Sequence, residues 1–285
     1  MEQRSKEWHD LRSKRIGSSD APVVLGVSPW NTPYGLWMQK MGLSESTKDN
    51  EAMSWGRETE PMALELFNQL NRRNMAPQVF DNSWQMASLD GYEPTTNEFL
   101  EIKCPFRNES DHLKAKDGII PEKYLPQIAH QFMLTKADRC YYFSFFKGDH
   151  TTIELTRGSF SSIYVDKLMD AEKRFWECMQ EFTPPELSAK DYETDIPLSA
   201  VQAIKDWKLQ KEIADYHSDL EKKYRELVLK ECQNKNTEAA GVKITKIIRR
   251  GAVDYALIPE IQDIDLEQYR KPPVESWRLT NKKET

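Results

Sequence analysis

Apolar and polar side chains alternate most clearly between Phe99 and Lys103. Neighbouring side chains of a strand point to opposite faces of the sheet. Leu100 and Ile102 are therefore expected on one face, and Glu101 and Lys103 on the other. The alternation predicts a strand that packs one face on the core and presents a carboxylate and an ammonium group together on the other face.

A helical period replaces this alternation after Pro121. Gln127 and Gln131 lie one turn apart on a polar line, and the apolar residues at helical spacing beside them are Tyr124, Ile128, Phe132 and Met133. The pattern predicts a helix with a core-facing side and a line of amides. Such a line could position water or phosphate beside a metal site, or simply form a solvated ridge.

The remaining pattern up to Phe182 predicts one mixed sheet with helices around it, an α/β arrangement. Helices are expected from the turn at 17–22, at Tyr34–Met41, from Met53 to Phe67 with Ala63, Leu64, Phe67 and Leu70 as the apolar stripe, and at Ser159–Phe182. Strands are expected at Gln78–Phe80, Trp84–Leu89 and Phe99–Cys104, and a hairpin at Arg139–Phe146 and Thr151–Leu155, turned at residues 147–150.

The pattern changes after Pro184 and Pro185. A long charged helix is predicted at Ser199–Cys232, with Ile213, Leu220 and Leu227 seven residues apart, so it needs a partner along that stripe, for which its own domain is the favoured candidate. A β segment at Val242–Tyr255 and an aromatic, basic tail at residues 275–278 follow. Residues 1–182 are therefore predicted to be a core, and residues 183–285 an appendage that touches DNA or another subunit, or only keeps the surface hydrated.

Composition narrows the class of protein. The chain of 285 residues has a net charge of −6 and no apolar run long enough to span a membrane, and its start has no apolar signal segment, so a soluble cytoplasmic protein is expected. Its four scattered cysteines form no pair of the C-x-x-C type and are expected to be reduced. The acidic balance excludes a protein that coats nucleic acid with a general basic surface, so any contact with DNA must be local.

The candidate chemistry lies between Ser88 and Pro105. Gly91, Pro94 and Asn97 are turn formers, so a strand that ends near Asp90 can return as a hairpin and bring Asp90 beside Glu101. Two carboxylates and Lys103 then share one corner. Carboxylate oxygens suit Mg²⁺ or Mn²⁺, and a lysine nearby can stabilise charge at a phosphate. The spacing alone is equally compatible with an exposed ion pair on an ordinary hairpin.

Three further places carry polar residues that could serve the same corner. Glu60 precedes Pro61 and is interpreted either as a first-turn glutamate that complements the helix dipole or as a further ligand. Ser19 or Asp20 can cap a helix whose free N–H groups attract an anion, and Arg12 with Ser19 could hold a phosphate. A simple capped helix with a solvated arginine explains the same residues.

Taken in order, these motifs resemble those of the YqaJ-like phage recombination exonucleases, a family that includes the bacteriophage lambda exonuclease. The resemblance covers about residues 5–182. It rests on Trp8-His-Asp-Leu-Arg12 with Gly17-Ser-Ser-Asp20, Trp55-Gly-Arg-Glu-Thr-Glu60, Ser88-Leu-Asp90-Gly, Glu101-Ile-Lys103-Cys-Pro-Phe106, and Gln127 within Tyr124-Leu-Pro-Gln-Ile-Ala-His-Gln. Five ordered matches are far more specific than one pair of carboxylates.

The resemblance implies the PD-(D/E)xK restriction-endonuclease-like fold and a Mg²⁺-dependent 5′-to-3′ exonuclease of phage or prophage origin. The enzyme would degrade one strand of linear duplex DNA, leave 3′ tails for strand annealing, form a ring-shaped homotrimer and work with a single-strand annealing protein. By the same resemblance, one or two metal ions would be held by Asp90, Glu101 and the Ile102 carbonyl, with Glu60 and Gln127 completing the metal and water shell. Lys103 would orient or activate the attacking water, and Arg12, Ser19 and Ser88 would bind the terminal 5′-phosphate.

The sequence departs from the family pattern in two places. Leu89 precedes Asp90 where the name of the fold has proline, and residues 183–285 extend beyond a minimal nuclease. Two alternatives stay open at this stage, because a fold does not fix a substrate. One is a structure-specific or restriction-type endonuclease, and the other is a DNA-end-binding recombination module that does not cleave.

Overall fold

The structure, a computed structural model, describes residues 3–44 and 50–252, together with residues 254, 258, 264, 269–273 and 279. It divides into two compact units, one that runs to Glu193 and one that begins at Thr194. The expected division into a core of residues 1–182 and an appendage of residues 183–285, with the functions assigned to them, stays a prediction.

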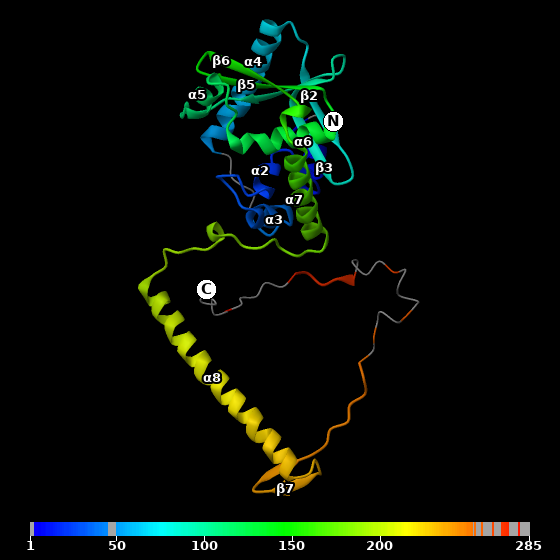
Figure 1. Ribbon diagram of the computed structural model, residues 1–285, viewed down its shortest axis with the longest axis vertical. Coiled ribbons are helices and arrows are strands. Elements are labelled where there is room, and N and C mark those ends of the chain that lie inside the picture. The colour runs from blue at the N-terminus through cyan, green and yellow to red at the C-terminus, as the bar shows by residue number, and fades with distance from the viewer. Residues whose placement is uncertain are drawn as a thin grey trace. The chain divides into compact units, whose positions relative to one another are not determined.

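The first unit alternates helices and strands along the chain (Figure 1). Its elements are α1 (Lys6–Ser13), β1 (Ile16–Gly17), α2 (Ala21–Val24), α3 (Pro33–Lys40), α4 (Glu51–Asn71), β2 (Ala76–Asp81), β3 (Gln85–Glu93), β4 (Glu98–Lys103), α5 (Ser110–Lys116), η1 (Glu122–Tyr124), α6 (Leu125–Thr135), β5 (Arg139–Phe146), β6 (Asp149–Thr156), η2 (Arg157–Ser159), α7 (Ser162–Gln180) and η3 (Ala189–Asp191).

The strands form one mixed sheet in the order β1-β3-β4-β5-β6, with β2 on the other edge of β3. β1 lies parallel to β3, and β4 lies parallel to β5. The β3–β4, β2–β3 and β5–β6 pairs are antiparallel. The predicted central mixed sheet flanked by helices is confirmed.

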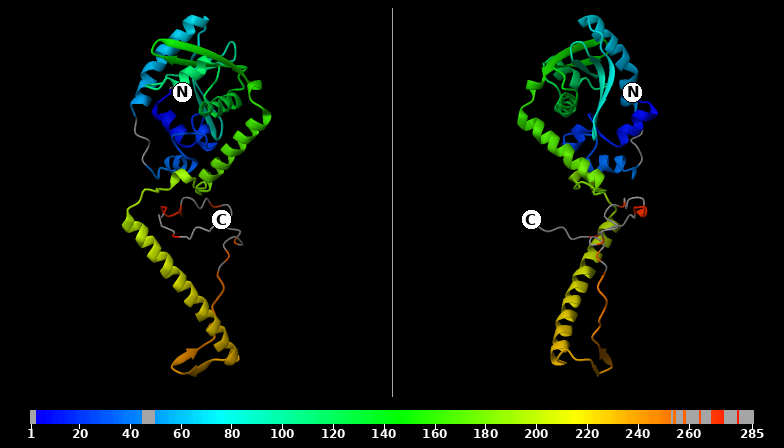
Figure 2. Two further views of the ribbon diagram at one scale, coloured as in Figure 1. Left: turned by 60° about the vertical axis from the view of Figure 1, so that its left-hand side comes forward. Right: turned by 90° about the vertical axis from the view of Figure 1, so that its right-hand side faces the viewer.

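Both faces of this sheet are covered, although the alternation in β4 predicts only one core-facing side. Leu100 and Ile102 pack with Phe67 of α4 on one face. Phe99 packs with Ile128 and the rest of the α5 and α6 cluster on the other face. In both views of Figure 2, α4 and α7 lie on opposite sides of the first unit. The carboxylate face of β4 is therefore the face that α6 covers.

Gly91 allows α4 to approach the β3–β4 pair closely. A Cβ at this position would lie 3.2 Å from Cδ1 of Leu64 in α4 and 2.9 Å from the Cβ of Met75, which follows that helix. Real side chains do not come so close, so any larger residue would push the helix away from the strands. The glycine thus sets the packing one residue away from Asp90.

Several predicted boundaries were wrong in ways that local pattern explains. β3 continues to Glu93, so Asp90 lies inside the strand and not at its end. The hairpin turn after β5 is only Lys147 and Gly148, both at positive φ, and Asp149 and His150 already belong to β6. Leu70 was expected in the apolar stripe of α4 but is 53% exposed, because the last turn of that helix extends past the core.

The second unit contains α8 (Leu198–Glu231) and a small hairpin of β7 (Thr237–Ala239) and β8 (Val242–Ile244). The predicted long helix is confirmed, and none of its residues is buried. The predicted β segment at 242–255 is wrong beyond Ile244, since 245–252 form no strand and Val253 and Tyr255 lie outside the described residues. The predicted tail at residues 275–278 also lies outside them, and packing of α8 on its own domain stays a prediction.

Two further features concern the described residues. All four cysteines are free. In the described part of the chain, no helix is both long enough and apolar enough to cross a membrane.

Candidate active site

The site opens along one edge of β3. β1 pairs with Gln85 and Met86 at one end of this edge, and β4 pairs with residues from Gly91 onward at the other end. Between them, residues 87–90 have no strand beside them on this edge. Ser88 and Asp90 alternate onto the same face of this stretch. Ser88 and Asp90 therefore both lie in the gap along β3 between its pairing with β1 and its pairing with β4.

Asp90 is fixed against the neighbouring strand. Its Oδ2 accepts a hydrogen bond of 2.7 Å from the backbone N–H of Ile102, and Gln3 Nε2 donates to the carbonyl of Leu89 at 2.8 Å. The hairpin brings Asp90 next to the β4 residues, as the turn formers predict.

Glu101 is the most enclosed carboxylate of the site, at 1% exposure. Gln127 Nε2 donates to its Oε1 at 2.7 Å, Gln131 Nε2 donates to its Oε2 at 2.6 Å, and Lys103 Nζ forms an ion pair with Oε1. Lys103 Nζ also donates to Gln127 Oε1 at 3.2 Å. The amide line of α6 thus lies against the carboxylate and not in solvent. Gln131 was noticed in the sequence only as the partner of Gln127 one turn away, and that spacing was the signal for it.

Glu60 reaches the same place from a different position in its helix than expected. It lies in the middle of α4, which starts at Glu51, so the interpretation as a first-turn glutamate was wrong. Pro61, which suggested a helix start, is inside the helix. Glu60 pairs with Arg4 at 3.4 Å and lines the same cleft as Lys103.

The three carboxylates concentrate negative charge. Burial, and then the charges of Glu101 and Glu60, raise the pKa of Asp90 well above its ordinary value. Burial also raises the pKa of Glu60, an effect that Arg4 opposes and Glu101 reinforces. Burial alone would lower the pKa of Lys103, but the charges of Glu101 and Asp90 outweigh it and raise that pKa. One ammonium group therefore faces more carboxylate charge than it can balance.

A second cluster, the phosphate clamp, joins Arg12, Ser19 and Ser88. Arg12 Nη2 donates to Ser19 Oγ at 2.8 Å. Trp8 connects this pair to β3, because its Nε1 donates to Ser88 Oγ at 2.7 Å and the Arg12 guanidinium lies over its ring at 5.2 Å. The structure thus brings all three predicted phosphate ligands together. Trp8 was part of the quoted motif, but no pattern revealed that it bridges them.

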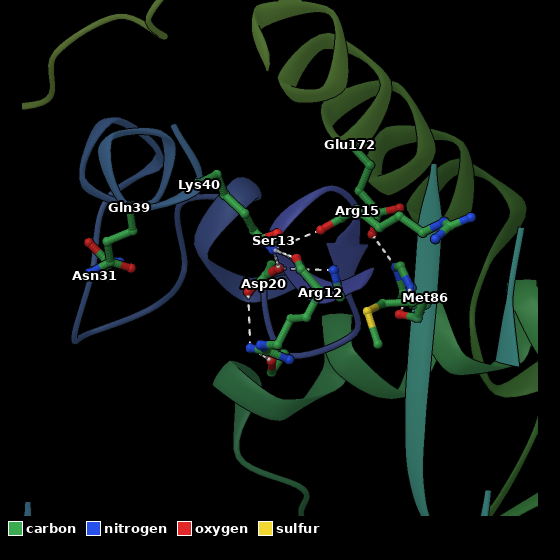
Figure 3. A network of polar contacts seen from close by, with 12 residues as sticks. Arg12, Ser13, Arg15, Asp20, Asn31, Gln39, Lys40, Met86 and Glu172 are labelled. Carbon is green, nitrogen blue, oxygen red and sulfur yellow. Dashed lines mark hydrogen bonds and ion pairs between the residues drawn. The ribbon is translucent and has the colours of Figure 1, made fainter. Parts of the chain in front are cut away.

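A buried ion pair between Lys40 and Asp20 lies next to Arg12 of the clamp (Figure 3). Lys40 Nζ lies 2.6 Å from Asp20 Oδ2 and donates to the carbonyls of Arg12 and Arg15, both at 2.7 Å. Asp20 also lies 3.4 Å from Arg12 Nη2 and accepts from the Gly17 N–H at 2.9 Å. Asp20 occupies the cap position of α2, as predicted, but its carboxylate serves this network and not the N–H groups of that helix.

Another buried pair holds α6 in place. His130 Nδ1 lies 2.7 Å from Glu172 Oε1 of α7, and His130 Nε2 lies 3.0 Å from the carbonyl of Met86. Gln85 Nε2 donates to the other Glu172 oxygen at 2.7 Å. Each ring nitrogen of His130 thus lies within hydrogen-bond distance of an oxygen atom. These contacts tie α6, α7 and β3 together beside the site.

Asp90, Glu101 and Lys103 form what is called here the metal corner, after its predicted role. A cleft of ≈ 680 Å³ leads away from it. Glu60, Ile102 and Lys103 line its inner end. Its other charged and aromatic lining residues are Trp30, Arg57, Phe106, Arg107, Asp111, Lys123 and Tyr124.

The donor set of the corner fits a divalent metal ion. Three carboxylates around a single lysine supply hard oxygen ligands and unbalanced negative charge. Gln131 Oε1, buried beside Glu101, has no hydrogen-bond partner among the described residues and is an acceptor that a water of hydration could use. The carboxyl groups are engaged by protein donors, however, and no three His, Cys, Asp or Glu side chains of the described residues are gathered as a metal cluster.

The first unit has a PD-(D/E)xK-like fold, which it shares with solved exonuclease structures. The solved alkaline exonuclease of Laribacter hongkongensis superposes with a TM-score of 0.53 at 19% identity, over 63% of this chain and 94% of that one. Its complex with dAMP gives a TM-score of 0.54 over the same shares of both chains. At this identity the likeness shows a common fold.

Residues 7–138 match the model of the YqaJ-like viral recombinase domain family. Protein YqaJ of Bacillus subtilis is 27% identical over 179 residues, which are 60% of this chain and 54% of that protein. Protein D345L of African swine fever virus is 28% identical over 159 residues, 45% of this chain and 44% of that protein. The match thus spans about half the length of these relatives. The family resemblance drawn from the five motifs is confirmed.

Proposed function

We propose that this chain is a metal-dependent exonuclease that degrades one strand of linear double-stranded DNA from its 5′ end. The observation that carries the proposal is that the phosphate clamp and the metal corner share β3. Ser88 and Asp90 are two residues apart on one strand face, a separation of roughly 6–7 Å. This is the scale of one nucleotide, so a terminal phosphate and the next phosphodiester could occupy the two places at once.

The clamp would select the end. Arg12 offers a planar guanidinium, and Ser19 and Ser88 offer hydroxyl groups, which together suit the oxygens of a terminal 5′-phosphate. Trp8 and the Lys40–Asp20 pair hold these groups in place. A site built around a phosphate monoester at a chain end favours attack from that end and disfavours internal sites.

The corner would cleave the next phosphodiester. Asp90, Glu101 and the Ile102 carbonyl, completed by Glu60, would hold one or two Mg²⁺ or Mn²⁺ ions, which supply water activation and charge neutralisation at the phosphate. Lys103 would donate from Nζ to the attacking water or to a phosphate oxygen that gains charge. Gln127 holds Lys103 and Glu101 together, so it keeps that ammonium group aimed at the corner.

The biological setting is part of the proposal. The family name and the exonuclease neighbours support a role in phage-type recombination. Removal of 5′-mononucleotides would leave 3′ single-stranded tails for a single-strand annealing partner. A ring-shaped homotrimer around the duplex would let a chain with a net charge of −6 stay on DNA without a basic surface.

The test follows each strand of a linear duplex that is labelled at one 5′ or one 3′ end. With Mg²⁺, the 5′ label should leave first as a mononucleotide while the 3′ label stays on long strands. Lys103→Ala should lose cleavage and keep DNA binding, and the exposed Lys114→Ala should match the unmutated protein. Turnover of Lys103→Ala at the wild-type rate in Mg²⁺ would refute the proposed role of Lys103 in cleavage.

Other outcomes separate the rival functions. Cutting of a covalently closed plasmid would support an endonuclease, and end binding without any cleavage would support a recombination module that does not cleave. Equal rates of the unmutated protein on 5′-phosphorylated and 5′-hydroxyl ends would refute the role of Arg12, Ser19 and Ser88.

A further inference from the structure

The segment that precedes α1 is anchored along the open stretch of β3. Gln3 Nε2 donates at 2.8 Å to the carbonyl of Leu89. Leu89 stands in the strand between Ser88 of the phosphate clamp and Asp90 of the metal corner. Ser5 then caps the start of α1 with its side chain. The segment is therefore fixed at both ends, beside the two places that the proposed substrate would fill.

Arg4, in the middle of this segment, has a backbone conformation that long side chains seldom adopt. Its φ is 68°, in the left-handed region where glycine or asparagine is usual. The contacts that fix the segment come from Gln3 and Ser5, so they do not require an arginine between them. A glycine would suit this backbone better. The reason for the arginine is therefore to be found in what its side chain does.

The guanidinium of Arg4 reaches the edge of the metal corner. Its Nη2 lies 3.4 Å from Glu60 Oε2, and the side chain is 47% exposed. An ion pair this long and this exposed adds little to stability. Among the described residues, Glu60 is the one hydrogen-bond or ion-pair partner of this side chain. A guanidinium has several N–H donors, so most of those of Arg4 remain available for a ligand.

The charge of the site makes an anion the ligand to expect. The carboxylates of the site outnumber the ammonium group of Lys103, which Glu101 and Gln127 already engage. A phosphate that approaches them is repelled unless a further cation offsets their charge. Arg4 is such a cation, and the planar fork of a guanidinium can donate to two oxygens of one phosphate at once.

The position of Arg4 selects one phosphate. A strand whose 5′-phosphate lies at the clamp would bring its first phosphodiester to the metal corner, beside which the guanidinium lies. We propose that Arg4 binds this first phosphodiester, the linkage that the corner would cleave, by donating to its nonbridging oxygens. The inference rests on the proposed function and adds to its substrate site a residue that no motif indicated.

The test is a thermodynamic cycle of equilibrium binding, with EDTA present to prevent cleavage. The probe is a 5′-phosphorylated hairpin duplex with one open end, whose first phosphodiester is either normal or an uncharged methylphosphonate. Arg4→Gly should weaken binding of the normal duplex by about tenfold or more, the effect of one lost charged contact. It should leave binding of the methylphosphonate duplex unchanged. A methylphosphonate placed at the fourth linkage should leave the full effect of Arg4→Gly.

Three controls separate this contact from other causes. Arg72→Gly makes the same change at another positive φ, 52°, at the C-terminal end of α4, and should leave the cycle unchanged. If Arg4 only masks the charge of Glu60, its substitution should have no effect in a Glu60→Gln background, whereas a direct contact predicts that the effect persists. In urea unfolding, Arg4→Gly should be at least as stable as the unmutated protein, since glycine suits a φ of 68°.

Each outcome decides for or against the contact. The proposal is overturned if Arg4→Gly weakens both duplexes equally, if the effect vanishes in the Glu60→Gln background, or if Arg4→Gly unfolds more easily. Coupling between Arg4 and the first linkage in a protein that never cleaves would overturn the proposed function and leave this inference standing. Cleavage from the 5′ end by a protein without that coupling would overturn this inference alone.

Discussion

Lys40→Met tests whether the buried ion pair positions the phosphate clamp. The lysine is 6% exposed and Asp20 is 7% exposed, and all three N–H groups of the ammonium have acceptors. Methionine preserves the length and most of the volume of the side chain but removes the charge. The substitution therefore removes the charge pair and the hydrogen bonds to the carbonyls of Arg12 and Arg15 while it keeps the packing of α3.

The expected loss of stability follows from what remains around Asp20. Removing one partner of a buried pair costs about 3–5 kcal/mol, because the other charge stays buried. Asp20 keeps the Gly17 N–H at 2.9 Å and Arg12 at 3.4 Å, so the loss should be near the lower end, about 3 kcal/mol. Lys40→Met combined with Asp20→Asn should be less destabilised than the sum of the two single variants.

The loss should depend on pH with a definite sign. Burial raises the pKa of Asp20, but Lys40 and Arg12 outweigh it and hold the pKa below its ordinary value of 3.8. A carboxyl group with a lowered pKa contributes stability above its ordinary value, and this contribution disappears as the pH falls through the lowered value. The difference in the free energy of unfolding between the unmutated protein and Lys40→Met should therefore be largest at neutral pH and should shrink below about pH 4.

Two measurements check the reasoning, with the exposed Lys14→Met as control. Urea unfolding followed by tryptophan fluorescence gives the free energy of unfolding. The ratio of kcat/KM on 5′-phosphorylated and 5′-hydroxyl ends gives the discrimination by Arg12, and it should fall about tenfold if the guanidinium loses its place. If the kcat/KM ratio stays at the wild-type value while the free energy of unfolding falls, Lys40 does not position Arg12. If the free energy of unfolding is unchanged, the pair of Lys40 and Asp20 does not stabilise the fold.

The other predictions concern contacts away from the clamp. His130→Leu should cost about 1–3 kcal/mol in urea unfolding, since one oxygen of the buried Glu172 would lose its hydrogen-bond partner. Adding Glu172→Met should recover part of this cost, and a double variant as unstable as the sum of the two single variants would contradict the pairing. Asp191→Ala should cost only about 0.5–1.5 kcal/mol in the same assay, the value of one hydrogen bond. An unchanged free energy of unfolding would show that the contact between Thr32 and Asp191 does not hold the loop before α3.

The parts of the site that could be predicted from sequence are those governed by a local period. The alternation in β4 separates Glu101 from Leu100 whatever the rest of the fold does, and the structure shows both on the expected faces. The amide line of α6 follows from a spacing of four residues in the same way. Side chains repeat every two residues along a strand and every 3.6 residues along a helix because of backbone geometry, so a short stretch of sequence is enough to reveal either repeat.

The parts that could not be predicted depend on contacts between distant segments. Lys40 is an ordinary lysine at the end of a short helix until α3 brings it under α1 and α2. Trp8 joins Ser88 across 80 residues of sequence. β1 has only two residues, too few for any period, yet it defines one side of the gap along β3. Pro61 suggested a first-turn position for Glu60, but it lies inside α4, which begins at Glu51.

The gap along β3 also bears on the product of the proposed reaction. Ser88 and Asp90 are carried by one strand, so the separation of the clamp and the corner is set by backbone geometry and not by the movement of one domain against another. A terminal phosphate seated at the clamp would then always present the same phosphodiester to the corner. Release of mononucleotides would follow from that fixed spacing.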